Sequence, residues 1–116
     1  SSIAGVEDIG APFPYNAAKA GLNAYAQSLA SFLGKFSVRV NVVAPGNILF
    51  EGGNWQTKLN SDPSTVWNMI REKVPLRQFG KPEDVGNLVA FLLSKRADFI
   101  TGVCIAVDGG QTKKFG

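Results

Sequence analysis

The clearest pattern of hydrophobic and polar positions predicts an amphipathic helix that begins at Pro82. Apolar residues recur there at positions i, i+3, i+4 and i+7, namely Val85, Leu88, Val89 and Leu92. Proline suits the first position of a helix, and Glu83 and Asp84 place negative charge in the first turn, where the helix dipole is positive. The stripe belongs either to the core or to a subunit interface, because periodicity does not distinguish the two.

Two further helices are predicted upstream. The segment from Tyr15 to about Gly34 is rich in alanine and leucine, which are strong helix formers, and glycine is a common residue at a helix end. A shorter helix is expected to follow Asp62, as its N-cap, with Pro63 in the first helical position. The apolar stripe of this shorter helix is Val66, Trp67, Ile70 and Val74.

Two runs have the composition of buried strands. Residues 37–44 (SVRVNVVA) are mostly β-branched and end at Pro45–Gly46, and residues 103–107 (VCIAV) end at an Asp-Gly-Gly sequence. Alternation of such strands with helices predicts α/β layers around a parallel sheet. Residues 1–14 read as a loop, and residues 47–62 show no readable period. Because two strands do not make a doubly wound sheet, we expect further strands in a partner or a missing N-terminal segment.

Composition and charge exclude several classes of protein. The 116 residues suit one domain, and no apolar run approaches the ~20 residues of a membrane span. The net charge of +3 comes from scattered basic residues rather than a cluster, which argues against nucleic-acid binding. No secretory signal or transit peptide is visible, so we expect a cytoplasmic protein without a membrane partner.

The chain has one cysteine and no histidine. Internal disulfides, zinc sites of the four-cysteine or cysteine–histidine type, and Ser-His-Asp or Cys-His catalysis are therefore excluded, and no metal site is predicted. A general acid or base in this chain must be Tyr, Lys, Asp, Glu or Cys104. Cys104 lies in an apolar run and is expected to be a small buried hydrophobe.

Tyr15 and Lys19 have the spacing Tyr-x-x-x-Lys on the predicted helix, which places them on one face. An ammonium that close favours the phenolate, so Tyr15 would serve as an acid or base near neutral pH. The alternative is a packing pair, in which the lysine stem covers the ring. The loop between Ser2 and Tyr15 is long enough to bring the Ser2 hydroxyl beside the phenol. There the hydroxyl would donate a hydrogen bond to a carbonyl oxygen of a substrate. The alternative is an ordinary turn serine.

Taken together and in order, these segments resemble the short-chain dehydrogenases/reductases. The resemblance runs through SSIAG, PYNAAKAGLNAYAQSLA, RVNVVAPGNI, PLRQFGKPEDVGNLVAFLLS and TGVCIAVDGG, and is weakest over residues 47–74. It implies that residues 1–116 are the C-terminal half of one doubly wound, parallel-sheet Rossmann-like α/β domain. The N-terminal half, which binds the dinucleotide phosphates, would be a separate partner or a missing segment.

The resemblance also implies roles for individual residues. Ser2 matches the serine that binds the substrate oxygen, Tyr15 the proton donor or acceptor, and Lys19 the residue that promotes tyrosine ionisation and binds the nicotinamide ribose. Pro45 and Gly46 match the turn that lines the nicotinamide. The backbone of Ile48 matches the position that meets the carboxamide.

Two features depart from the family pattern. Phe50 stands where relatives often carry threonine, so no cofactor role is assigned to it. The glycine-rich phosphate loop is absent, and Gly109–Gly110 cannot replace it because no helix follows them. Trp55 lies in the segment that would cover the substrate, where it would either shape the pocket or simply pack.

The expected activity is hydride transfer between a nicotinamide cofactor, NAD or NADP, and a small alcohol or carbonyl substrate, with Tyr15 as acid/base. The isolated chain is expected to be inactive, and the enzyme to be a homodimer or homotetramer. The alternative is a non-enzymatic remnant or scaffold unit of the same fold that has lost cofactor binding.

Overall fold

The computed structural model describes residues 1–114 and arranges them as four α-helices, three 3-10 turns and two strands. The elements are η1 (Ile3–Gly5), α1 (Phe13–Leu33), η2 (Gly34–Phe36), β1 (Val42–Pro45), α2 (Asn54–Ser61), α3 (Pro63–Lys73), α4 (Pro82–Leu93), η3 (Lys95–Ala97) and β2 (Cys104–Val107).

Helices α3 and α4 begin where their capping residues predict. The Asp62 side chain accepts a hydrogen bond from the Thr65 N–H at 3.4 Å, at the start of α3. The Asp84 carboxylate accepts from the Lys81 N–H at 2.7 Å, at the start of α4. Both helices also carry proline in the first turn, so local sequence fixes their starts.

Helix α1 confirms the helix predicted from Tyr15 to about Gly34, but the chain does not reverse its direction at Gly34. The chain continues through η2, and the reversal comes at Ser37, whose φ is 59°. The Ser37 N–H donates to the Gly34 carbonyl at 2.9 Å, and the Val38 N–H to the Leu33 carbonyl at 3.3 Å. These bonds satisfy the end of the helix without glycine in the left-handed position.

Strand β1 is shorter than the predicted run of residues 37–44. Val42 pairs with Cys104 and Pro45 with Val107 in a parallel ladder. Before Val42, one backbone bond remains, from the Gly102 N–H to the Val40 carbonyl at 2.8 Å, and side chains make the other contacts. The Arg39 guanidinium and the Asn41 amide both donate to the Ile100 carbonyl, at 3.1 and 3.0 Å. β-branched composition therefore overstated the length of the strand.

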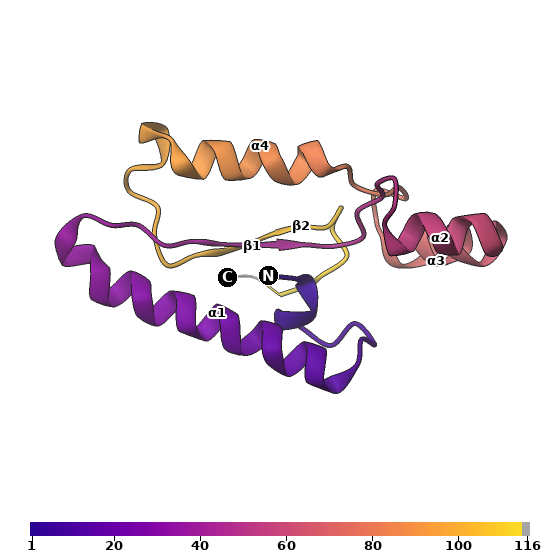
Figure 1. The fold of residues 1–116 in the computed structure, drawn as a ribbon, viewed down its shortest axis with the longest axis horizontal. Coiled ribbons are helices and arrows are strands. Elements are labelled where there is room, and N and C mark those ends of the chain that lie inside the picture. The colour runs from indigo at the N-terminus through magenta and orange to yellow at the C-terminus, as the bar shows by residue number, and fades with distance from the viewer. Residues whose placement is uncertain (115–116) are drawn as a thin grey trace.

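The sheet lies between two helical layers, as Figure 1 shows: α1 runs along one face of β1 and β2, and α4 along the other. Helices α2 and α3 lie beyond the end at which β1 finishes (Figure 1). This is the predicted α/β architecture. In the part of the chain that is described, no helix has the length and apolar character needed to span a membrane.

The segment without a readable period contains helix α2. Its apolar residues Trp55 and Leu59 pack against a buried cluster formed by Val66, Ile70, Val74 and Phe79. Trp67 packs on the same cluster, so the predicted stripe of α3 is confirmed. Two apolar residues in an eight-residue helix are too few to show a period, which is why the pattern did not reveal α2.

Large apolar side chains remain exposed on the outer helices. On α1 they include Phe13, Tyr25 and Phe32, and on α4 they include Val89 and Leu93. Within the predicted α4 stripe, Leu92 is buried while Val85 and Leu88 are half-buried. The stripe therefore contributes to the core through Leu92, and Val89 stays at the surface.

Candidate functional site

The candidate site lies where both strands end and η1 packs beside them. The Gly46 N–H, directly after β1, donates to the Val107 carbonyl at 2.9 Å. A Cβ added to Gly46 would lie 2.7 Å from the Asp108 Cβ and 3.5 Å from the Ile3 Cδ1. Only glycine allows the three segments to approach this closely. In α/β proteins, ligands bind at this carboxyl end of parallel strands.

Ser2 caps the turn η1. Its Oγ accepts a hydrogen bond from the Ala4 N–H at 3.1 Å. Because a hydroxyl has one hydrogen to donate and this bond uses only a lone pair, the Ser2 O–H remains able to donate to a ligand. Ile3 and Ala4 are buried, so the turn is anchored by packing while Ser2 stays half-buried.

Tyr15 and Lys19 meet on α1, as their spacing predicts. The Lys19 Nζ lies 5.4 Å from the centroid of the Tyr15 ring, within the range of a cation–π contact. Tyr15 is 45% exposed, so its hydroxyl is accessible from solvent. Among residues 1–114, no side chain forms a salt bridge or hydrogen bond with the Lys19 ammonium, which leaves its donors for a ligand.

Helix α1 and the Ser2 turn are packed backbone to backbone. A Cβ added to Gly5 would lie 2.7 Å from the Lys19 carbonyl carbon. The Ser1 Oγ donates to the Lys19 carbonyl at 3.5 Å, and the Ser1 nitrogen donates to the Val43 carbonyl at 3.0 Å. The structure therefore brings the Ser2 turn, the Lys19 turn of α1 and strand β1 together.

Pro45 ends β1, and Ile48 follows in an isolated parallel bridge with Gly80. The bridge uses the Asn47 carbonyl, which accepts from Gly80 at 3.0 Å, and the Leu49 N–H, which donates to Gly80 at 2.9 Å. Ile48 lies between these two groups, and in a parallel bridge the N–H and carbonyl of such a residue point away from the partner strand. Within residues 1–114 the Ile48 backbone groups have no protein partner.

Asp108 organises the loop after β2, a role that sequence reasoning missed. Its Oδ1 accepts from the Gly110 N–H at 3.0 Å, and its Oδ2 from the Thr112 N–H at 2.8 Å and Oγ1 at 2.7 Å. Burial raises the pKa of this carboxyl, but the hydrogen bonds from Thr112, Gly110 and Gln111 outweigh burial and leave the pKa below its ordinary value of 3.8. The sequence signal is an Asp-Gly-Gly turn with threonine four residues after the aspartate.

The Trp55 ring packs against Phe79 and the cluster around it. Its ring centroid lies 5.6 Å from that of Phe79, and the Lys58 Nζ lies 4.6 Å from the Trp55 ring. These contacts support the packing interpretation, while a role in shaping the substrate pocket stays a prediction. Phe50, to which no cofactor role was assigned, is half-exposed.

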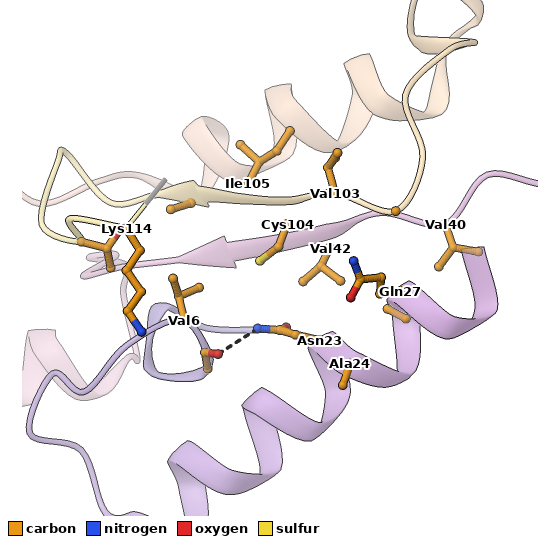
Figure 2. Close-up of a pocket in the computed structure, with 15 residues that line it drawn as sticks. Val6, Asn23, Ala24, Gln27, Val40, Val42, Val103, Cys104, Ile105 and Lys114 are labelled. Carbon is orange, nitrogen blue, oxygen red and sulfur yellow. Dashed lines mark hydrogen bonds between the residues drawn. The ribbon is translucent and has the colours of Figure 1, made fainter. Parts of the chain in front are cut away.

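The prediction that Cys104 is buried is wrong. The thiol is half-buried and faces a cavity of about 670 Å³ between α1 and the sheet. Figure 2 shows Cys104 and Val42 on the side of the strands that faces Asn23 and Ala24 of α1. The α1 residues that line this space include the small Ala24 and Ala26, which leave it unfilled. Partial burial raises the pKa of the Cys104 thiol above its ordinary value of 9.0.

Comparisons with known proteins agree with this architecture. Residues 1–112 match a family model described as enoyl-(acyl carrier protein) reductase. The chain is 38% identical over 99 residues to isoepoxydon dehydrogenase of Penicillium expansum, covering 85% of this chain and 38% of that protein. It is 41% identical over 107 residues to cyclohexanol dehydrogenase of a Rhodococcus species, covering 92% of this chain and 38% of that protein.

Solved structures give the same result. L-sorbose reductase of Gluconobacter frateurii, complexed with NADPH and L-sorbose, superposes with a TM-score of 0.87 at 32% identity, covering 98% of this chain and 46% of that chain. 4-Hydroxyisoleucine dehydrogenase complexed with NADH superposes with a TM-score of 0.86 at 30% identity, covering 97% of this chain and 44% of that chain. The chain thus spans less than half the length of these proteins.

Proposed function

The chain belongs to the short-chain dehydrogenase/reductase family, and we propose that it forms part of an NAD(P)-dependent oxidoreductase that interconverts an alcohol and a carbonyl compound. The observation that carries the proposal is the convergence of three segments at the carboxyl end of β1. The capped Ser2 turn packs on α1 at Lys19, beside the strand that ends in Pro45–Gly46.

The residues present fit a nicotinamide nucleoside. The Ile48 N–H and carbonyl, both without a protein partner in residues 1–114, form the donor and acceptor pair that complements a carboxamide. The Lys19 ammonium supplies donors for ribose hydroxyls, and Pro45 and Gly46 would line the ring. Similar proteins carry NADH and NADPH, which supports either dinucleotide here. When bound, the nicotinamide supplies or accepts the hydride.

The side chains of this chain supply the proton chemistry. In the reducing direction, the Ser2 hydroxyl donates a hydrogen bond to the substrate carbonyl oxygen, on which negative charge develops. The Tyr15 hydroxyl gives its proton to that oxygen and becomes a phenolate, which the adjacent Lys19 ammonium stabilises. In the oxidising direction, the Tyr15 phenolate takes the proton of the alcohol.

The proposal includes an N-terminal half of the same domain as a partner of these residues. A sheet of two parallel strands leaves its edges unpaired, and the Ser1 nitrogen already bonds to the Val43 carbonyl along β1. A further strand at this edge would complete the sheet and carry the phosphate-binding loop. The exposed apolar side chains of α1 and α4 support assembly as a homodimer or homotetramer.

The test is Tyr15→Phe in the complete enzyme, assayed with NAD and NADP against a panel of alcohols and carbonyl compounds. We expect turnover to fall by at least ~100-fold, because the proton donor is lost while the ring remains. Tyr25→Phe is the matched control: Tyr25 is another exposed tyrosine of α1, and its variant should keep wild-type turnover. Near-normal turnover of Tyr15→Phe would reject the assigned role. A folded complete protein without dinucleotide-dependent activity would support the scaffold alternative.

A further inference from the structure

Asn23 joins helix α1 to the turn that carries Ser2. It lies one helical turn after Lys19, and its Nδ2 donates to the Gly5 carbonyl at 3.1 Å. Figure 2 shows this bond as the dashed line from Asn23. The contact links the helix that carries Tyr15 and Lys19 to the 3-10 turn η1.

A continuous set of hydrogen bonds leads from Asn23 to Ser2. The Gly5 N–H donates to the Ser2 carbonyl at 3.0 Å, and the Ala4 N–H donates to the Ser2 Oγ at 3.1 Å. Gly5 thus bonds to Ser2 through its N–H and to Asn23 of α1 through its carbonyl, so the short turn that holds the Ser2 hydroxyl is tied to the helix. The close approach of Gly5 to the Lys19 backbone adds a steric contact at the same place.

The other end of the Asn23 amide is unsatisfied. Its Oδ1 is buried and has no hydrogen-bond partner among residues 1–114. Buried polar atoms without partners destabilise a fold, and an apolar side chain of the same size would avoid this penalty. Reversing the amide would set its oxygen against the Gly5 carbonyl, so the orientation with Nδ2 on Gly5 is the favourable one. The stabilisation from the Nδ2 bond to Gly5 is therefore offset by the unpaired oxygen of the same amide.

We propose that Asn23 is a positioning residue, which fixes the Ser2 hydroxyl relative to Tyr15 and Lys19. The proposal rests on the proposed function, because it assigns Asn23 an effect only through Ser2. No contact with substrate or cofactor is assigned to Asn23. Since catalysis is sensitive to displacements of about 1 Å, a loosened Ser2 turn slows the reaction without removing any reacting group.

The experiment is a double-mutant cycle in the complete enzyme with Asn23→Leu and Ser2→Ala. We expect Asn23→Leu to lower kcat about tenfold or more, by no more than Ser2→Ala does, with the KM for the dinucleotide unchanged. In the Ser2→Ala background, Asn23→Leu should have no further effect, because the group that it positions is gone. A merely structural role would lower kcat equally in both backgrounds, and that result would overturn the proposal.

Two further variants sharpen the test. Gln27→Leu is the matched control: Gln27 lies one turn further along α1 and lines the same cavity, and its side chain forms no hydrogen bond with the described residues. It should keep wild-type kcat. Gly5→Ala forces the turn away from Lys19 and should reproduce the Asn23→Leu effect, again only where Ser2 is present. If Ser2→Ala and Tyr15→Phe leave kcat unchanged, the proposed function fails; if they lower kcat and Asn23→Leu does not, the positioning role alone fails.

Discussion

At the residue scale, Lys19 is the group whose charge matters most to the proposed chemistry. Its ammonium lies 5.4 Å from the centroid of the Tyr15 ring, where it is placed to stabilise the negative charge that Tyr15 carries during proton transfer. Lys19→Met keeps an apolar stem but removes the charge. We therefore expect kcat for alcohol oxidation to fall at least about tenfold in the complete enzyme and dinucleotide binding to weaken.

The measurement is kcat for alcohol oxidation, under conditions in which chemistry limits the rate, together with the affinity for the dinucleotide. Lys35→Met is a matched control, because the Lys35 Nζ also lies over an aromatic ring of α1, 4.7 Å from the Phe32 centroid, at the far end of the helix. It should leave kcat and the dinucleotide affinity unchanged. If Lys19→Met also leaves both unchanged, Tyr15 and Lys19 are only a packing pair.

Asp108 gives a prediction about stability and pH. Its hydrogen bonds hold the carboxyl pKa below 3.8 in the folded protein, so the ionised form stabilises the fold. This stabilisation is complete above the unfolded-state value and is lost as pH falls below 3.8 through the lower, folded pKa. Asp108→Asn should cost about 1 kcal/mol at neutral pH, since an amide cannot accept all of these bonds.

Thermal unfolding of the wild type and Asp108→Asn between pH 7 and pH 2 tests this prediction. The difference in free energy of unfolding should be constant at neutral pH and shrink in the acid range. Asp98→Asn is a suitable control, because the Asp98 side chain is exposed and accepts no hydrogen bond from the described residues. A difference that is the same at both ends of the range would mean that the Asp108 charge does not stabilise the loop.

The individual site residues differ in how far sequence could assign them. The helical spacing predicts the contact of Tyr15 with Lys19, and the structure confirms it. Ser2 is placed beside α1 by Gly5 and Asn23, whose contacts depend on tertiary packing that no spacing rule describes. The part that Asp108 plays in its loop was predictable, because its partners Gly110 and Thr112 lie within four residues, and the Asp-Gly-Gly sequence followed by threonine is the local signal.

At the element scale, helix starts were more predictable than strand ends. Proline and an acidic cap define α3 and α4 through contacts within four residues, so the sequence contains the full signal. The first half of the predicted strand is instead held by Arg39 and Asn41, which bind a carbonyl some 60 residues away in the chain. Such long-range bonds compete with the sheet ladder and leave no trace in local composition.

Helices α2 and α3 share their own hydrophobic cluster, which predicts a local response to mutation. Ile70 is 0% exposed at the centre of the cluster, and Ile70→Ala removes methyl groups that the surroundings cannot replace. We expect a loss of about 2–4 kcal/mol in the free energy of unfolding of these helices. Hydrogen exchange of the complete protein should show faster exchange in α2 and α3 than in α4 and the strands.

Glu72→Ala is the control variant, because it shows whether any substitution in α3 is enough to change the exchange rates. Glu72 is exposed on the same helix and its side chain makes no hydrogen bond with the described residues, so truncating it should leave exchange rates close to those of the wild type. Equal acceleration of exchange across all elements in Ile70→Ala would show that the cluster is part of one cooperative core rather than a local unit.

At the scale of the whole molecule, the proposed function assigns the described residues one end of a dinucleotide site. In that proposal Lys19 and Ile48 bind the nicotinamide ribose and carboxamide, whereas pyrophosphate binding needs free backbone N–H groups at a glycine-rich helix start. The starts of α3 and α4 are capped by the carboxylates of Asp62 and Asp84, which repel a phosphate. In the proposed function, the described residues supply the catalytic side chains, and the N-terminal half of the domain supplies the glycine-rich loop that anchors the phosphates.

This division predicts that the 116-residue chain alone will not bind NAD(H) or NADP(H) at micromolar concentrations. Calorimetric titration of the isolated chain with each dinucleotide is the measurement, and the complete enzyme is the positive control. Circular dichroism of the same sample must first show the helical content of α1 and α4, so that absence of binding is not caused by unfolding. Micromolar binding by the folded chain would mean that Lys19, Ile48 and the strand ends hold the dinucleotide without a phosphate loop, and the proposed division between two halves of the domain would have to be abandoned.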